Sequence, residues 1–227
     1  MPNSPSSLAL DWLHRGYSVL TSTIAEDLVE ELQQDFAELS QGAHAVRGAL
    51  GCSPTVQRVA ELVQPLAEEL ACAPVKATKG TYFDKTAESN WQVAWHQDLT
   101  ITVSERHEVS GFQHWRDKEG LWHVEPPVEI LERIVALRLY LDDCPVDHGA
   151  LRLIPGSHLQ GKLSEETIAQ FAQQYPLRTP ELRAGQVLAL SPLLLHASSK
   201  CEQPHHRRIL HLEYSPDELP TPLRWQG

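Results

Sequence analysis

The stretch Ile134-Val-Ala-Leu-Arg-Leu-Tyr-Leu-Asp142 alternates between purely apolar and mixed side chains. Successive side chains of an extended strand point to opposite faces, so every second residue here shares a face. We expect the apolar face to pack under helices and the mixed face to line the interior between two sheets; a mixed face in solvent is the equal alternative. The apolar face is Val135, Leu137, Leu139 and Leu141, and the mixed face is Ile134, Ala136, Arg138, Tyr140 and Asp142.

The same period of two recurs in short segments from about Pro74 onward. Turns rich in glycine, proline and aspartate separate these segments, mostly without intervening helices. The pattern predicts a mainly β protein with an antiparallel double sheet of the jelly-roll type. The other predicted strands are Val75–Asp84, Leu151–Ile154, Gln186–Leu190 and Arg207–Tyr214.

Helical spacing dominates the N-terminal third of the chain. The segment Thr23-Ile-Ala-Glu26 has the form of a capping box before one helix, and Ser53-Pro54 suits the start of a second. Pro65 is expected to break or kink that second helix. A short helix is also predicted from a Ser164 cap to Tyr175. The apolar faces of the first two helices carry Leu28, Leu32, Phe36 and Leu39, and Val56, Val59 and Val63.

The length of 227 residues predicts a single domain over residues 1–227, with a helical part at about 1–73 and a β-core at about 74–215. The net charge of −11 argues against a nucleic-acid partner and an anionic membrane surface. No segment resembles a membrane span or a signal peptide, and the four cysteines lack CxxC spacing. We therefore expect a cytoplasmic protein with reduced cysteines that acts on a small molecule.

Residues 99–133 have little periodicity but an unusual aromatic content. The segment includes Trp115 and Trp122 and ends near Pro126-Pro127. A loop of this length in a compact domain is typically a lid or a binding loop. We expect it to act as a lid or substrate loop, with both tryptophans as candidate substrate contacts.

The segment His96-Gln97-Asp98 places an imidazole and a carboxylate two residues apart on an extended chain. Side chains at i and i+2 point the same way, so this pair could supply two ligands of a 2-His-1-carboxylate metal site. The same spacing occurs by chance in a chain with twelve histidines, and we interpret His123/Glu125 and His211/Glu213 as coincidences. His196 is expected to end a strand, Gln186–Leu195, and Arg207 follows eleven residues later.

Three marks together resemble the phytanoyl-CoA dioxygenase family of Fe(II)- and 2-oxoglutarate-dependent oxygenases. The likeness covers about Lys79 to Tyr214, over half of the chain. The marks are the His96-Gln97-Asp98 segment, the block from Leu141 to His158 that ends in Pro155-Gly156-Ser157-His158, and Ser191-Pro-Leu-Leu-Leu-His196-Ala-Ser198 followed by His206-Arg207-Arg208.

The resemblance implies a double-stranded β-helix of cupin-like architecture with iron held by His96, Asp98 and His196. It also implies that Arg207, helped by the Ser198 hydroxyl, binds the far carboxylate of the cosubstrate 2-oxoglutarate, with Gln97 nearby. Arg208 is the rival for Arg207, but strand alternation favours Arg207 because it shares the polar face with His211. The implied reaction uses dioxygen to hydroxylate a small molecule and releases succinate and carbon dioxide.

Two alternatives stay open on the sequence alone. One is a zinc- or manganese-dependent hydrolase or isomerase on a similar barrel, and the other is a binding protein that has lost its chemistry. His158 is interpreted as structural. Candidate contacts to the substrate are Lys85, Asn90, Arg138, Tyr140, Trp115 and Trp122.

Overall fold

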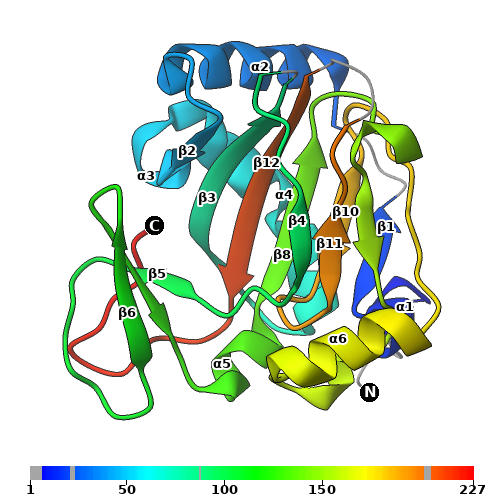
Figure 1. The fold of residues 1–227 in the computed structure, drawn as a ribbon. Coiled ribbons are helices and arrows are strands. Elements are labelled where there is room, and N and C mark those ends of the chain that lie inside the picture. Colours follow the sequence, from blue (N-terminus) through cyan, green and yellow to red (C-terminus); the bar gives the residue numbers. More distant parts are fainter. Residues whose placement is uncertain (1–6, 21–23, 87, 202–205) are drawn as a thin grey trace.

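The alternating strand around Leu137 lies in the interior of a six-stranded antiparallel sheet (Figure 1). The computed structural model describes residues 7–20, 24–86, 88–201 and 206–227, to which all structural statements refer. The order of the sheet is β1 (Tyr17–Leu20), β10 (Val187–Leu190), β8 (Val135–Tyr140), β12 (Arg207–Ser215), β3 (Lys76–Lys85) and β2 (Ala45–Arg47). The strands predicted by alternation are therefore present, each within two residues of its expected bounds.

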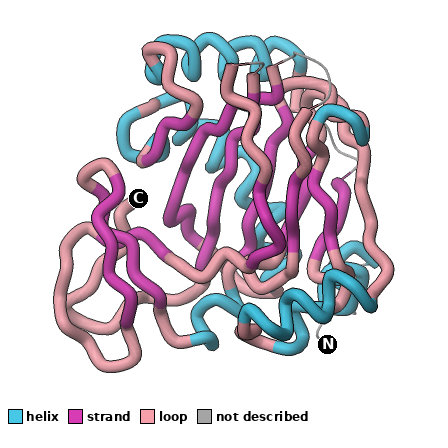
Figure 2. The backbone as a smooth tube through the Cα atoms, viewed as in Figure 1, coloured by secondary structure: helices cyan, strands magenta, loops and turns pink. Residues whose placement is uncertain are grey.

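A second, three-stranded sheet faces the first across a buried interior that holds both apolar and charged side chains (Figure 2). Its order is β4 (Val93–His96), β11 (His196–Ser198) and β9 (Leu151–Leu153). Ala136 and Tyr140 of β8 pack with Leu151 and Leu153 of β9 in the buried cluster between the sheets. The mixed face of β8 therefore points inward, as expected, and the mainly β double-stranded β-helix is confirmed.

The helix α4 (Pro54–Ala71) lies against the outer face of the six-stranded sheet, and α2 (Glu26–Ser40) runs across one end of its strands (Figure 1). Their side chains and the apolar face of β8 belong to one buried cluster, which includes Leu32, Val59 and Leu137. Each of these three side chains is fully buried. Burying apolar area at roughly 25 cal/mol per Å² is the dominant favourable contribution here, and it fixes which face of β8 is left for the interior.

The predicted starts of the helices are confirmed at two of three positions. Ser53 Oγ accepts a hydrogen bond from the Val56 N–H at 3.0 Å and caps α4. Ser164 Oγ accepts one from the Thr167 N–H at 3.2 Å and caps α6 (Glu165–Gln174). The N-cap of α2 is Ala25, which has no side-chain cap, and Thr23 of the expected capping box lies outside the described residues.

The sequence predicts a break or a kink at Pro65. The break is wrong, because α4 continues to Ala71, and the kink stays a prediction. Proline inside a helix costs about 3 kcal/mol through its missing N–H and its ring. The last turns of α4 bury Ala67 and Leu70 in the cluster under the sheet. The gain from burying these turns outweighs the cost of the proline, so the helix does not end there.

The expected strand Gln186–Leu195 is also wrong in extent, since β10 ends at Leu190 and β11 begins only at His196. Between them the Leu194 N–H donates to the Ser191 carbonyl at 3.0 Å and closes a turn. Pro192 has no N–H for a strand ladder. The chain therefore leaves the six-stranded sheet at this turn, and His196 opens a strand of the other sheet instead of ending the first.

Residues 99–133 are not a structureless loop. They form a small third sheet and a helix, placed beside the C-terminal segment (Figure 1). The polar sequence of the edge strand that contains Trp115 hid the alternation, because Trp115 is its apolar contribution to the buried cluster of this sheet. The elements are β5 (Ile101–Val103), β6 (Gln113–Lys118), β7 (Leu121–Glu125) and α5 (Val128–Arg133).

The sequence patterns did not predict several short elements. These are α1 (Ser7–Arg15), α3 (Ala49–Cys52) and two 3-10 turns, η1 (Val146–His148) and η2 (Ser157–Gln160). Each of the four cysteines lies within the described ranges, and none of them forms a disulfide. Among the described residues, no helix combines the length and apolar character needed to cross a membrane.

Replacing the buried cap Ser53 with alanine should lower the free energy of unfolding by about 1–2 kcal/mol. Ser53 Oγ also donates to the Asp35 carboxylate at 2.8 Å, so this change removes two hydrogen bonds from the main core. Ser164→Ala is the matched control, and it should cost less than about 0.5 kcal/mol because α6 has no buried residues and frays locally. Urea denaturation measures both values, and equal losses would contradict this account.

Candidate metal centre

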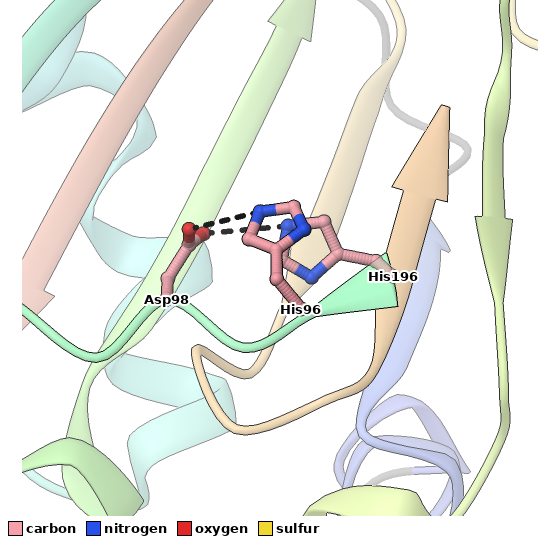
Figure 3. A group of neighbouring side chains, drawn as sticks. All are labelled: His96, Asp98 and His196. Carbon is pink, nitrogen blue, oxygen red and sulfur yellow. Dashed lines mark ion pairs between the residues drawn. The ribbon is translucent and has the colours of Figure 1, made fainter. Parts of the chain in front are cut away.

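Three potential metal ligands converge where β4 pairs with β11 (Figure 3). His96, the last residue of β4, is the direct antiparallel partner of His196, the first residue of β11. Asp98 Oδ1 lies 3.6 Å from His96 Nε2, and Asp98 Oδ2 lies 3.5 Å from His196 Nε2. One ligand atom from each of the three residues lies within 4.8 Å of the other two. Two imidazoles and one carboxylate in this arrangement form the donor set of a facial metal site.

The backbone fixes the orientation of both imidazole rings. His96 Nδ1 bonds to the Ala94 carbonyl at 2.8 Å, and His196 Nδ1 bonds to the Leu194 carbonyl at 2.9 Å. A carbonyl only accepts, so each Nδ1 carries the proton and each Nε2 presents a lone pair toward Asp98. Such bonds from the outer ring nitrogen are characteristic of metal-binding histidines. The donor set therefore fits a divalent transition metal in its chemistry as well as in its spacing.

The charges in the centre suit a metal ion. Burial lowers the pKa of His196 to about 3, so this ring is neutral. Burial also acts to raise the pKa of Asp98, but the facing imidazoles and the Arg138 guanidinium hold it well below its usual range. For His96, burial acts to lower the pKa, but the neighbouring Asp98 carboxylate raises it above its ordinary value. The centre thus contains an ionised carboxylate beside one imidazole that is held neutral.

A cavity of about 190 Å³ opens from these three residues into the interior between the sheets. Its walls carry two arginines, and Arg207 lies on β12 while Arg138 lies on β8. The remaining wall is apolar and aromatic except for one hydroxyl, that of Ser198. Its lining residues are Phe83, Trp91, Val93, His96, Asp98, Arg138, Leu151, His196, Ser198, Arg207 and Ile209.

Arg207 and Lys85 bring two buried cations to the region around Ser198. Lys85 Nζ donates to Ser198 Oγ at 2.8 Å and to the Ser199 carbonyl at 2.9 Å. Arg207 Nη1 donates to the Gly149 carbonyl, while Arg207 Nε has no partner. Within the described ranges, neither cation forms an ion pair with a carboxylate. Burial, followed by the nearby charge of Arg207, lowers the pKa of Lys85 to about 7. This end of the cavity is therefore suited to an anion.

Arg208 points away from this cavity and is already paired. Its Nε and Nη2 donate to the Asp142 carboxylate at 2.9 and 2.6 Å in a two-pronged ion pair. This contact lies on the opposite side of β12 from Arg207, as alternation predicts. Of the two neighbouring arginines, Arg207 is the one that lines the cavity.

A larger cavity of about 730 Å³ adjoins the centre through His96 and Asp98. Several of its walls carry basic side chains, a feature that the sequence patterns did not reveal. His114, Arg116 and Lys118 reach it from alternate positions of β6, opposite Lys162. The alternation of basic residues within residues 113–118 could have predicted this basic face, but a strand without an alternating apolar face is hard to identify from sequence. Its lining residues are Lys79, Trp95, His96, Gln97, Asp98, Leu99, Thr100, His114, Arg116, Lys118, Glu125, Lys162, Leu163, Ser164, Glu165 and Ile168.

Gln97 is buried, and its side-chain amide forms hydrogen bonds with backbone groups of neighbouring loops. Its Nε2 donates to the carbonyls of Gly161 and Leu193 at 2.8 and 2.7 Å, and its Oε1 accepts from the Leu163 N–H at 2.8 Å. These bonds fasten the segment between the two metal-ligand candidates to neighbouring loops. A contact of Gln97 with the cosubstrate stays a prediction.

The other predicted pocket residues divide into two groups. Tyr140 is fully buried between the sheets with an unpartnered hydroxyl, and Asn90 bonds to the backbone of Cys201 through both ends of its amide. Trp115 and Trp122 pack edge to face at 6.4 Å in the apolar cluster of the small sheet. Neither tryptophan is among the lining residues of the two cavities, because both contribute to the core on the other side of that sheet.

The remaining histidine motifs lie outside the donor set. His123 is buried without a partner for either ring nitrogen, and Glu125 pairs with Lys162 instead. His211 Nε2 bonds to Glu213 at 3.0 Å, so this pair is a buried polar contact. His158 packs against Gly16, where a Cβ would lie 2.5 Å from its Nδ1, in keeping with a structural role.

Fold and donor set together define a metal-dependent enzyme of the double-stranded β-helix class. The model of the family described as phytanoyl-CoA dioxygenase (PhyH) matches residues 12–209. This chain therefore belongs to the phytanoyl-CoA dioxygenase family of Fe(II)- and 2-oxoglutarate-dependent oxygenases, as its three sequence marks predicted.

Relatives of known activity or structure resemble nearly the whole chain. L-proline trans-4-hydroxylase of Streptomyces griseoviridis is 24% identical over 241 residues, which cover 88% of this chain and 82% of the relative. The iron-bound crystal structure of EctD from S. alaskensis has a TM-score of 0.73 at 20% identity, covering 98% of this chain and 82% of EctD. The α-ketoglutarate-dependent carbocyclase SnoK from nogalamycin biosynthesis has a TM-score of 0.72 at 16% identity, covering 95% and 85%. The structural likenesses establish the shared fold.

Replacing His96, Asp98 or His196 with alanine should weaken Mn(II) binding by at least about 100-fold, because each change removes one of three donors. The matched control is His107→Ala. His107 also has a carboxylate two residues away, Glu105 at 3.3 Å, but it is not part of a three-residue donor group. Calorimetric titration of the metal-free protein measures the affinities. Mn(II) binding of normal strength in His96→Ala would contradict the assignment.

Proposed function

We propose that this protein is an Fe(II)- and 2-oxoglutarate-dependent dioxygenase that hydroxylates a small molecule and releases succinate and carbon dioxide. The observation that carries the proposal is one cavity lined both by the donor set and by the buried cation Arg207. The relative from Streptomyces griseoviridis is named as a hydroxylase of L-proline, and one EctD structure contains 2-oxoglutarate. When bound, the iron would allow dioxygen and 2-oxoglutarate to oxidise a C–H bond of the substrate.

In this proposal His96, Asp98 and His196 hold the iron. Both Nε2 lone pairs are already directed at the Asp98 carboxylate by the Nδ1 bonds to the backbone. Three ligands on one face leave the remaining positions of an octahedral ion free for other ligands. The rigid pairing of β4 with β11 keeps the donors in place before the metal arrives, which limits the entropy lost on binding.

Arg207, Ser198 and Lys85 would bind the far carboxylate of 2-oxoglutarate. A guanidinium binds a carboxylate through two parallel hydrogen bonds, and a dry site strengthens the pair. Both cations are buried, with Lys85 fully inaccessible and Arg207 only 5% exposed. A carboxylate would supply the acceptor that Arg207 Nε lacks. The cavity thus matches a molecule with a metal-binding group at one end and a carboxylate at the other.

A metal-dependent hydrolase or isomerase and a binding protein without catalytic activity are the two alternatives, and neither explains both Arg207 with Lys85 and the open metal positions. A zinc hydrolase or isomerase has no need of Arg207 and Lys85, and a binding protein has no need of open metal positions. Succinate formed in step with 2-oxoglutarate consumption, and dependent on added Fe(II), supports the dioxygenase. Purified protein that neither consumes 2-oxoglutarate nor binds it in the presence of Mn(II) would contradict the proposal.

Arg207→Ala should raise the dissociation constant for 2-oxoglutarate by about 30-fold or more, because it removes a buried charge-assisted pair worth about 2–5 kcal/mol. The neighbouring Arg208→Ala should change that constant less than about threefold, since its guanidinium is paired with Asp142 outside the cavity. Calorimetry on the Mn(II)-loaded protein compares the two variants. The reverse order of effects would show that Arg208 is the ligand.

Binding of 2-oxoglutarate should weaken as the pH rises above about 7, because Lys85 then loses its proton. A carboxylate ligand favours the protonated amine, so affinity should fall by up to about tenfold per pH unit above the pKa. The dissociation constant is measured from pH 6 to 8.5. In Lys85→Met the affinity should be low and nearly independent of pH. A flat profile in the unaltered protein would exclude Lys85 from the carboxylate site.

A further inference from the structure

Arg138 is a buried cation without an adequate partner. Its side chain is only 13% exposed, and Nε has no hydrogen-bond partner. Among the described residues, its polar contacts are two that involve Nη2, to Asp98 Oδ2 and to His196 Nε2, both at 3.5 Å. This distance is at the outer limit for a hydrogen bond. Burying a guanidinium is costly unless it is paired, so its environment points to an anion that completes the site.

A metal ion makes this shortage of acceptors more severe. The Nε2 lone pair of His196 and a carboxylate oxygen of Asp98 are the groups that would bind the metal. A lone pair that binds a metal cannot also accept a hydrogen bond from Arg138. The nearest acid on the inward face of the next strand is Glu213, and Lys79 at 2.7 Å and His211 at 3.0 Å already hold it. The loaded centre therefore leaves the guanidinium at most the second Asp98 oxygen as an acceptor, at the long distance of 3.5 Å, and its other N–H groups lack a carboxylate.

The backbone positions of Arg138 and Arg207 are well separated along the sheet, which favours a separate anion position for each guanidinium. Arg138 pairs in register with His211, four residues along β12 from Arg207. At about 3.3 Å per residue the two positions are separated by about 13 Å along the sheet. The two anion positions are then one at the distal end of the cavity and one beside the metal centre.

One wall of the larger cavity is basic, although other parts of its lining carry Glu125 and Glu165, in a chain with a net charge of −11. Within the described residues, Arg116 and Lys118 line that cavity and form no ion pair. Burial lowers the pKa of Lys118, and the neighbouring charges of Arg47, Lys79 and Arg116 lower it further. A positive wall beside the centre raises the local concentration of anionic molecules and speeds their arrival.

We propose that the substrate is an organic acid whose carboxylate binds the Arg138 guanidinium, beside the metal centre. The inference rests on the proposed function, and it narrows the substrate class to molecules with a carboxylate a few bonds from the oxidised carbon. The forked geometry of arginine fixes the orientation of a carboxylate as well as its position. Arg138 would therefore select which C–H bond faces the iron.

The test uses the Mn(II)-loaded protein saturated with N-oxalylglycine, a non-reacting analogue of 2-oxoglutarate. The probes are L-amino acids and short aliphatic carboxylic acids, each paired with its carboxamide. At least one acid should raise the melting temperature and bind in calorimetry, whereas its uncharged amide should not. In Arg138→Gln that acid should bind at least about 30-fold more weakly, and Arg138→Lys should recover part of the loss.

Arg183→Gln is the matched control, because it removes an exposed arginine outside both cavities. It should leave binding of the acid unchanged. Arg138 could instead bind the carboxylate of 2-oxoglutarate that lies nearer the metal. The affinity for N-oxalylglycine is therefore also measured in Arg138→Gln. A change of less than about threefold supports the substrate assignment. A loss as large as that for the acids would assign Arg138 to the cosubstrate and overturn the inference.

Two further results would also overturn it: stabilisation by amides as strong as by acids, or no acid that stabilises the loaded protein. Failure of the proposed function is distinguishable from both. In that case the unaltered protein would not bind Mn(II) and N-oxalylglycine together, and this is measured before any probe is added.

Discussion

The antiparallel pairing of β4 with β11 is the constraint on which the rest of the site depends. It places His96 directly opposite His196, a residue one hundred positions later in the chain. The backbone carbonyls of Ala94 and Leu194, each two residues before its histidine, then orient the two rings in the same way. The turn after His96 brings Asp98 to both Nε2 atoms. The strand register thus sets the positions of the candidate metal ligands, and the hydrogen bonds of the rings restrict their orientations.

Around this centre the fold separates apolar packing from buried charge. Helix α4, with α2 in the same buried cluster, takes up the apolar face of the six-stranded sheet, so its other face is free to carry polar groups into the interior. Arg138 and Arg207 stand on adjacent strands of that face, and the smaller sheet closes over them. The cost of burying these cations is high unless anions complete the cavity. In our proposal, this imbalance of charge would make the cavity prefer anionic ligands.

Much of this arrangement could be predicted from the sequence. The alternation at Leu137 and Leu139 predicted the buried strand and its facing helices. The spacing of His96 and Asp98 indicated two possible ligands, and the resemblance to the family implied the full donor set with His196. What could not be predicted depends on tertiary context. Pro65 is tolerated because the turns after it are buried, and the apolar run after Leu190 is divided between two sheets by a turn. The polar strand that holds Arg116 has no apolar period, so its basic wall was found only in three dimensions.

The central claim is that one ion binds to all three donors while Arg207 binds the distal end of the keto acid. A crystal structure of the protein with Mn(II) and 2-oxoglutarate tests it most directly, with anomalous scattering to locate the metal. The account predicts one ion at about 2.0–2.3 Å from both Nε2 atoms and an Asp98 oxygen, with the far carboxylate of 2-oxoglutarate on Arg207. Manganese bound elsewhere, or a keto acid whose distal carboxylate lies away from Arg207, would contradict it.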